Sequence, residues 1–276
     1  MKNIIVVTGG AGFIGSNLIS FLIKKTKLKI ISIDNYSNGK LINIAIKDNI
    51  DLAGYPTTAG SIAMLDNVPE YDAFIVSKLK QNGFNISGKT NLSEWANFRS
   101  EKSISGWSSH GGQTINPFGE NLNPCGSSSG SAVAVASGLV DVAIGTETNG
   151  SISCPASVNG IVGFKPTVGL VSRHGIIPIS STQDTAGPMG KSVKLVAEVL
   201  EAIAGPDIKD IATLFIPKNF NYDFTSELEN NNIAGKRLGL LKSGEDYDAA
   251  NQLLEKITDL VNMLGGTVVE IVDPRI

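Results

Sequence analysis

Two glycine- and serine-rich turns within Pro124–Pro155 constrain the fold more than any other part of this sequence. The first turn is Gly126–Ser131 and the second is Thr148–Ser151, and between them lie a predicted helix at Ser131–Ser137 and a predicted apolar strand at Val140–Ile144. Glycine permits close backbone approach, and successive N–H groups in such a turn form a concavity for negative charge. Serine hydroxyls beside that concavity suit attack on a carbonyl group. A solvated Gly/Ser linker would lack the compact apolar stretch.

The composition is that of a globular protein rather than of a nucleic-acid-binding or membrane-spanning one. The chain has 276 residues, of which 42% are hydrophobic and 18% are charged, enough for a sizeable core. A net charge of −3 argues against binding to nucleic acid or to an anionic membrane. No apolar run reaches the ~20 residues of a membrane span. Because Thr8–Gly10 interrupts the apolar N-terminus, no secretory signal is predicted either.

The two cysteines and two histidines are too few to predict a disulfide framework or a zinc site. Cys125 and Cys154 stand beside the two serine-rich turns, and we interpret them as small buried packing residues rather than as a redox pair. Reduced cysteines favour a cytoplasmic location. No metal is expected, because His110 and His174 lie far apart in the sequence.

Residues 1–40 show the order strand, glycine-rich turn, helix, strand and acid. In dinucleotide-binding folds such a turn approaches the pyrophosphate, and the acid binds a ribose hydroxyl. The corresponding residues here are Gly9, Gly12, Gly15 and Asp34. The segment resembles the first βαβ unit of extended short-chain dehydrogenases and sugar-nucleotide epimerases. That resemblance implies one functional hypothesis, an NAD-dependent epimerase or reductase.

The dehydrogenase resemblance ends near Lys40, because no further βα units of that kind follow. Those enzymes also place a tyrosine and a lysine four residues apart deep in the chain. Here this spacing occurs only at Tyr36 and Lys40, in the loop after the second strand, where it cannot serve. We therefore interpret residues 1–40 as a Rossmann-like βαβ fragment, with nucleotide binding kept as the less favoured alternative, and residues 41–276 as a different domain.

Residues 41–276 alternate between predicted helices and strands, which favours an α/β fold with a mixed β-sheet covered by helices on both faces. A polar, glycine-rich stretch at residues 99–123 is predicted to be an ordered functional loop. Helices are predicted at Tyr71–Gly83, Asn91–Phe98, Ser131–Ser137, Cys154–Asn159, Val193–Ala204 and Asp248–Leu264. Strands are predicted at Phe84–Ile86, Val140–Ile144, Gly160–Ser172, Gly175–Ser180, Lys236–Lys242 and Thr267–Val272.

Lys47 is a candidate base because it follows an apolar run and precedes Asp48 and Asn49. Burial of the amine would lower its pKa and leave it neutral near physiological pH. The residues alone leave open a second interpretation, that of a solvated lysine at a strand end.

Seven segments in order make residues 42–276 resemble the amidase signature family. Among its branches, the chain looks most like bacterial amidases of the peptide-amidase type and less like the glutamine-dependent tRNA amidotransferase component. The segments are AIKDNIDLAG, PTTAGS, GKTNLSEW, NPCGSSSGSAVAVA, GTETNGSISCPAS, GIVGFKPTVGLVSRHGIIPIS and QDTAGPMG.

The resemblance implies a catalytic triad of Lys47, Ser127 in a cis peptide bond, and the nucleophile Ser151. Ser127 and Ser151 are 24 residues apart, the interval that the family shows. Two positions depart from the pattern, since Asn149 and Ser129 stand where many members have glycine. The resemblance implies an oxyanion hole formed by the amides of Thr148, Asn149 and Gly150, with that of Ser151.

The implied reaction is hydrolysis of a carboxylic amide to acid and ammonia, without a cofactor. Neither serine-rich turn contains a histidine, so a neutral Lys47 would take the proton of Ser151 through Ser127, and acyl-Ser151 would then be hydrolysed. The substrate would be a small-molecule or peptide amide, and we expect Trp107 and Ile179–Asp184 to lie near it.

An inactive fusion or fragment is a third hypothesis. Family members usually carry a helical segment before the lysine motif, where this chain has the βαβ pattern. They also continue well beyond the position of Ile276. The domain is therefore expected to be incomplete at its C-terminus, with an open pocket.

Overall fold

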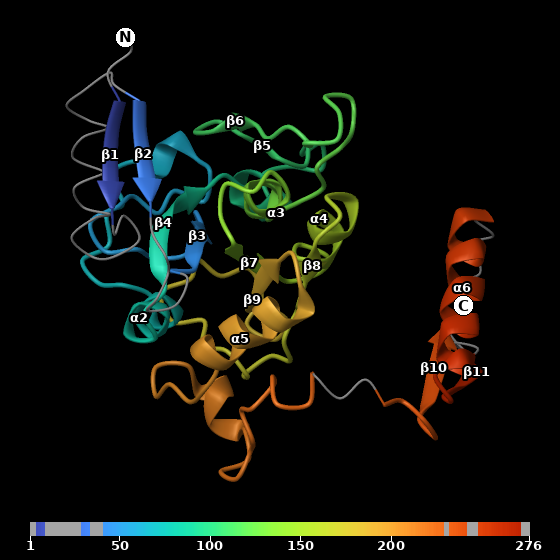
Figure 1. Ribbon diagram of the computed structural model, residues 1–276. Helices are drawn as coiled ribbons and strands as arrows, with labels where there is room; N and C mark the ends of the chain where they lie inside the picture. Colours follow the sequence, from blue (N-terminus) through green and yellow to red (C-terminus); the bar gives the residue numbers. More distant parts are fainter. Residues whose placement is uncertain (1–3, 9–28, 34–40, 229–231, 242–247, 272–276) are drawn as a thin grey trace. The chain divides into compact units, whose positions relative to one another are not determined.

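The computed structural model describes residues 4–8, 29–33, 41–228, 232–241 and 248–271 (Figure 1). Gly9, Gly12, Gly15 and Asp34 lie outside these ranges, so the predicted nucleotide site stays a prediction. The same holds for Tyr36 and Lys40. Contacts divide the chain into two compact units, Met1–Phe224 and Thr225–Ile276.

Two parallel strands near the N-terminus confirm both strands predicted there. β1 (Ile4–Thr8) pairs with β2 (Lys29–Ile33), with Ile4 opposite Lys29. A parallel pair requires a crossover connection. The segment that would contain the predicted helix lies outside the described residues.

A five-stranded mixed sheet forms the centre of the first unit, in the order β4-β3-β7-β9-β8. β3 (Asn43–Lys47) runs parallel to both its neighbours, β4 (Asn85–Thr90) and β7 (Val142–Glu147). β9 (Thr185–Gly190) runs antiparallel to β7 and to the short edge strand β8 (Val162–Gly163). The mixed sheet is as predicted.

Side chains of β3 alternate between the two faces of the sheet, as successive strand residues must. Ile44 and Ile46 are fully buried in the larger core with α2 (Phe74–Gln81) and α5 (Val193–Ile203). These helices present Ile75, Val76, Leu79, Val199, Leu200 and Ile203 to that core. Ser192 caps α5 by accepting a hydrogen bond from the Leu195 N–H.

The opposite face of the sheet is covered by α3 (Ser129–Ala136), which confirms the expected cover on both faces (Figure 1). Ala45 and Ala143 pack there against Val135 of α3. Small residues let this helix approach closely. A Cβ atom built on Gly130 would lie 2.5 Å from the Asn91 carbonyl oxygen, so only glycine fits.

The remaining elements of the first unit are short. The predicted loop at residues 99–123 contains a two-stranded antiparallel hairpin, and the predicted helix at Asn91–Phe98 is only a 3₁₀ turn. The elements are η1 (Ile62–Met64), η2 (Glu94–Asn97), β5 (Trp107–Ser108), β6 (Gly112–Gln113), α4 (Ser153–Val158) and η3 (Ile211–Phe215).

Two strand predictions are corrected, and in the first of them, Gly160–Ser172, only Val162–Gly163 is a strand. Gly175–Ser180 is not a strand, and its only pairing is an isolated bridge between Ile176 and Ile50. Conversely, β9 was missed, because its sequence TAGPMG combines glycine and proline, which are unusual in strand interiors. Pro188 is accommodated in the antiparallel register opposite Ile144.

The second unit has the order strand, helix, strand that its sequence predicts. β10 (Arg237–Leu241) pairs in parallel with β11 (Thr267–Ile271), and α6 (Asp248–Met263) lies between them in the chain. Within the described parts of the chain, no helix has the length and apolarity to cross a membrane.

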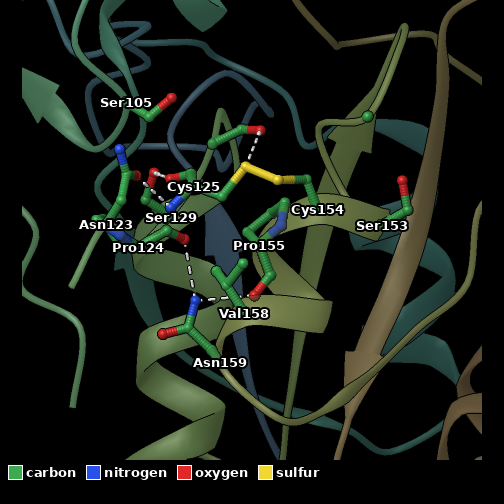
Figure 2. Close-up of a disulfide and its surroundings, with 12 residues drawn as sticks. Ser105, Asn123, Pro124, Cys125, Ser129, Ser153, Cys154, Pro155, Val158 and Asn159 are labelled. Atoms are coloured by element: carbon green, nitrogen blue, oxygen red, sulfur yellow. Dashed lines mark hydrogen bonds between the residues drawn. A yellow bond between two sulfur atoms is a disulfide. The ribbon is translucent and has the colours of Figure 1, made fainter. Parts of the chain in front are cut away.

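Cys125 and Cys154 form a disulfide with Cα atoms 6.0 Å apart, which corrects the expectation of reduced, buried cysteines (Figure 2). Both residues are half-buried. Asn159 reinforces the link, because its Nδ2 donates to the carbonyl oxygens of Pro124 and Pro155. The pairing was missed because the two turns that bear the cysteines become neighbours only through tertiary packing.

The disulfide predicts a measurable loss of stability on reduction. In the chain-entropy view, a cross-link across 29 residues stabilises the fold by about 3–4 kcal/mol. A dithiol reductant, or the double substitution C125S/C154S, should lower the denaturant midpoint accordingly. In protein purified without reductant and then denatured, a thiol assay should find no free thiols. Two free thiols per chain would contradict the disulfide.

Candidate functional site

Lys47 ends β3 and points its amine into the protein interior. The residue is completely buried, and its Nζ lies 2.8 Å from Ser127 Oγ, 2.8 Å from Thr146 Oγ1 and 3.2 Å from the Thr146 carbonyl oxygen. None of these partners is charged. Burial lowers the pKa of Lys47 to about 7, although Glu147 and Asp184 act in the opposite direction through their negative charge. The interpretation as a solvated lysine is therefore wrong.

Lys89 is the other lysine of this part of the sheet, and its setting differs. Its Nζ lies 2.9 Å from Asp48 Oδ1, and it also donates to the Pro56 carbonyl and to Thr57 Oγ1. Burial lowers the pKa of Lys89 as well, but the Asp48 carboxylate opposes that shift. Lys89 thus has a carboxylate among its partners, whereas the partners of Lys47 are all neutral.

The first serine-rich turn is tied to β7 just before α3 begins. The Gly126–Ser127 peptide bond is cis, and Ser127 is completely buried. Ser128 Oγ donates to the Thr146 carbonyl at 3.1 Å and accepts from the Thr146 N–H at 3.2 Å. These two bonds hold the Ser127 hydroxyl beside the Lys47 amine.

The second turn follows β7 and leads into α4. Ser151 is 8% exposed, and its carbonyl oxygen accepts the Ser128 N–H at 3.1 Å, so the two turns are joined directly. Among the described residues, the Ser151 hydroxyl makes no hydrogen bond to Ser127 or to any other group.

Glu147 organises the second turn, and the sequence reasoning missed it. Its carboxylate accepts the N–H groups of Gly150 at 2.8 Å, Ile152 at 2.7 Å and Ser153 at 2.8 Å. Desolvation alone would raise the pKa of Glu147, but these hydrogen bonds outweigh it and hold the pKa below the usual value. The available signal was a lone acid at the end of an apolar strand, four residues before Ser151.

The amides predicted for an oxyanion hole are not equivalent. The Gly150 N–H is occupied by Glu147 Oε1. Within the described part of the chain, no acceptor binds the N–H groups of Thr148, Asn149 and Ser151. The turn, in which Gly150 has φ +84°, thus presents free donors beside the Ser151 hydroxyl.

A cavity of about 220 Å³ is lined by Thr148 of this turn, but Lys47, Ser127 and Ser151 are not among its lining residues. One wall is apolar, formed by residues 176–179, and the other includes Asn49 and residues 146–148. The segment predicted to lie near the substrate contributes Ile179, Ser181 and Asp184 to the lining. Trp107 is not among the lining residues, and its ring instead stacks against the Arg99 guanidinium at 4.8 Å.

No metal site is evident in the described ranges, because no three His, Cys, Asp or Glu side chains gather there. The groups that the site offers for chemistry are its hydroxyls, its amine and its backbone donors.

Comparison with known proteins identifies the family of the chain. The Amidase family model matches residues 30–276. The chain is 46% identical over 203 residues to a probable amidase of Arabidopsis thaliana, covering 72% of this chain and 38% of that one. It is 41% identical over 237 residues to a component of the glutamyl-tRNA(Gln) amidotransferase of Rippkaea orientalis, covering 85% and 47%.

Among solved structures, the native peptide amidase from Stenotrophomonas maltophilia is similar at a TM-score of 0.82 with 47% identity, covering 96% of this chain and 53% of that one. The chain thus spans about half the length of these relatives or less. The extent of the family match and these identities show that the chain belongs to the amidase family.

Proposed function

We propose that this chain carries the catalytic centre of an amidase that hydrolyses a carboxylic amide through an acyl-serine intermediate. The observation that carries the proposal is the 2.8 Å contact between the buried Lys47 amine and the Ser127 hydroxyl. That contact lies in a turn joined to Ser151 by a backbone hydrogen bond.

The proposed proton path runs from Ser151 through Ser127 to Lys47. With a pKa of about 7, Lys47 is partly neutral at physiological pH and can accept the Ser127 proton as Ser127 takes that of Ser151. The Ser151 oxygen then attacks the amide carbon. Free N–H donors of Thr148, Asn149 and Ser151 stabilise the oxyanion, each typically worth about 3–4 kcal/mol. Collapse of the intermediate returns the proton to the leaving nitrogen, releases ammonia and leaves acyl-Ser151, which water hydrolyses.

The proposed substrate class rests on the relatives. The similar solved structure is a peptide amidase, and related chains are amidotransferase components. We propose a small-molecule or peptide amide as the substrate, with no cofactor.

Replacing the proposed nucleophile tests this assignment. S151A should lower ammonia release by roughly four orders of magnitude or more, because the acyl-enzyme cannot form. S157A is the matched control, since Ser157 is an exposed serine of α4. Ammonia release would be measured on short aliphatic amides and on an amidated dipeptide. Equal turnover by S151A and the starting protein would refute the proposal.

The pH dependence of turnover should report the protonation of Lys47. Only neutral Lys47 can act as the base, so kcat/KM should rise with pH through a midpoint of about 7. K47M should abolish turnover, whereas K89R should retain the same midpoint because Lys89 is ion-paired. A wild-type midpoint unrelated to Lys47, or turnover in K47M, would remove Lys47 from the mechanism.

The lowered pKa of Lys47 should also make the free energy of unfolding depend on pH. Between pH 7 and 10.5, the unfolded chain holds a proton on Lys47 that the folded chain lacks. The free energy of unfolding should therefore increase with pH in this window by up to about 1.4 kcal/mol per unit. Denaturant titrations should show this slope reduced in K47M. An unchanged slope would contradict the lowered pKa.

A further inference from the structure

The Asp184 carboxylate joins the second turn to the apolar wall of the cavity. Its Oδ1 accepts the hydroxyl of Thr148 at 2.5 Å. Its Oδ2 accepts the backbone N–H groups of Ile179 at 2.7 Å and Ser180 at 2.8 Å. One side chain therefore has three donors drawn from two segments that lie about 30 residues apart in the sequence.

A second anchor holds the same wall without touching the turn. Arg173 donates from Nη1 to the Ser181 carbonyl at 2.5 Å, and its guanidinium is paired with Asp210 at 2.7 Å. The wall is thus fixed at two adjacent points, and only the Asp184 point is connected to Thr148. A substitution of Asp184 therefore affects both the turn and the wall, whereas a substitution of Asp210 affects the wall alone.

We propose that Asp184 is a positioning residue that aligns Thr148, and with it the free N–H donors of the turn, against the cavity wall. The inference rests on the proposed function, because the value of that alignment lies in stabilising the oxyanion. A carboxylate suits the task, since it accepts three hydrogen bonds at once and charge-assisted bonds are short and strong. Oxyanion donors contribute only when they are preorganised.

The negative charge of Asp184 also affects the pKa of Lys47, which a neutral side chain at this position would not do. Asp184 and Glu147 are the carboxylates whose charge acts on Lys47, and both favour its protonated form. Removing the charge of Asp184 should therefore shift the acid limb of the pH profile to lower pH. A purely structural defect would lower activity without moving the limb.

A double-mutant cycle between Thr148 and Asp184 tests the proposal. T148A removes the hydroxyl from the turn and should lower kcat roughly tenfold with KM within about twofold, whereas T148S should restore it. D184N should lower kcat similarly, raise KM through the loosened wall and move the acid limb. In the double variant the losses should not multiply, because both substitutions break one connection.

D210N is the matched control. It removes a carboxylate that lines the same cavity and supports the wall through Arg173, but it has no bond to Thr148. Its effect on kcat should multiply with that of T148A. The inference would be overturned if the losses of kcat in D184N and T148A multiplied in the double variant. It would also be overturned if T148S lost as much kcat as T148A, a result that does not depend on how well D184N folds.

Hydrogen exchange of the turn separates this inference from the proposed function. D184N should speed amide exchange at Ile179 and Ser180, whether or not the protein turns over an amide, because Asp184 accepts both N–H groups. If S151A is as active as the starting protein, the proposed function fails while the exchange result still stands. Unchanged exchange at both amides would overturn the positioning role.

Discussion

The site depends on a lysine amine that is buried with no direct ion-pair partner among the described residues. Lys47 is placed by β3, a central strand between two parallel neighbours, so its backbone cannot move independently of the sheet. Its amine contacts only neutral oxygens from Ser127 and Thr146. Desolvation is then not compensated by an ion pair, and the amine can lose its proton near pH 7. Lys89 differs, because its amine lies 2.9 Å from the Asp48 carboxylate, whose charge opposes the lowering of its pKa.

The two serine-rich turns act as one assembly held at several points. Ser128 bonds β7 and Ser151, Glu147 gathers the amides that flank Ser151, and the Cys125–Cys154 disulfide links the same turns covalently. These hydrogen bonds and the disulfide fix the backbone N–H donors and the serine hydroxyls before a substrate binds. Catalytic electrostatics require that preorganisation, since reorienting dipoles during the reaction would cost free energy.

Close packing of small residues makes this assembly sterically feasible. Gly126, Gly130 and Gly145 each meet a neighbouring atom at less than 3 Å from where a Cβ would stand. The contacts are with Ser93 Oγ, with the Asn91 backbone, and with Met189 and Ser128. The glycines and alanines of this region therefore allow α3 and its preceding turn to lie directly on the sheet, beside the end of β3.

Much of the fold could be predicted from the amino-acid sequence, including the order of the elements, the mixed α/β class, and most helix and strand positions. The motifs that contain Lys47, Ser127 and Ser151 also pointed to the family. Local periodicity and turn chemistry indicate the elements, whereas the family rests on the resemblance of seven motifs in order. Only the tertiary structure revealed the neutral surroundings of Lys47 and the contacts of Glu147 and Asp184. The same holds for the disulfide and for the strand formed by TAGPMG. Each of these depends on contacts between segments distant in sequence. Burial, hydrogen-bond partners and cross-links are properties of such contacts, and no single segment encodes them.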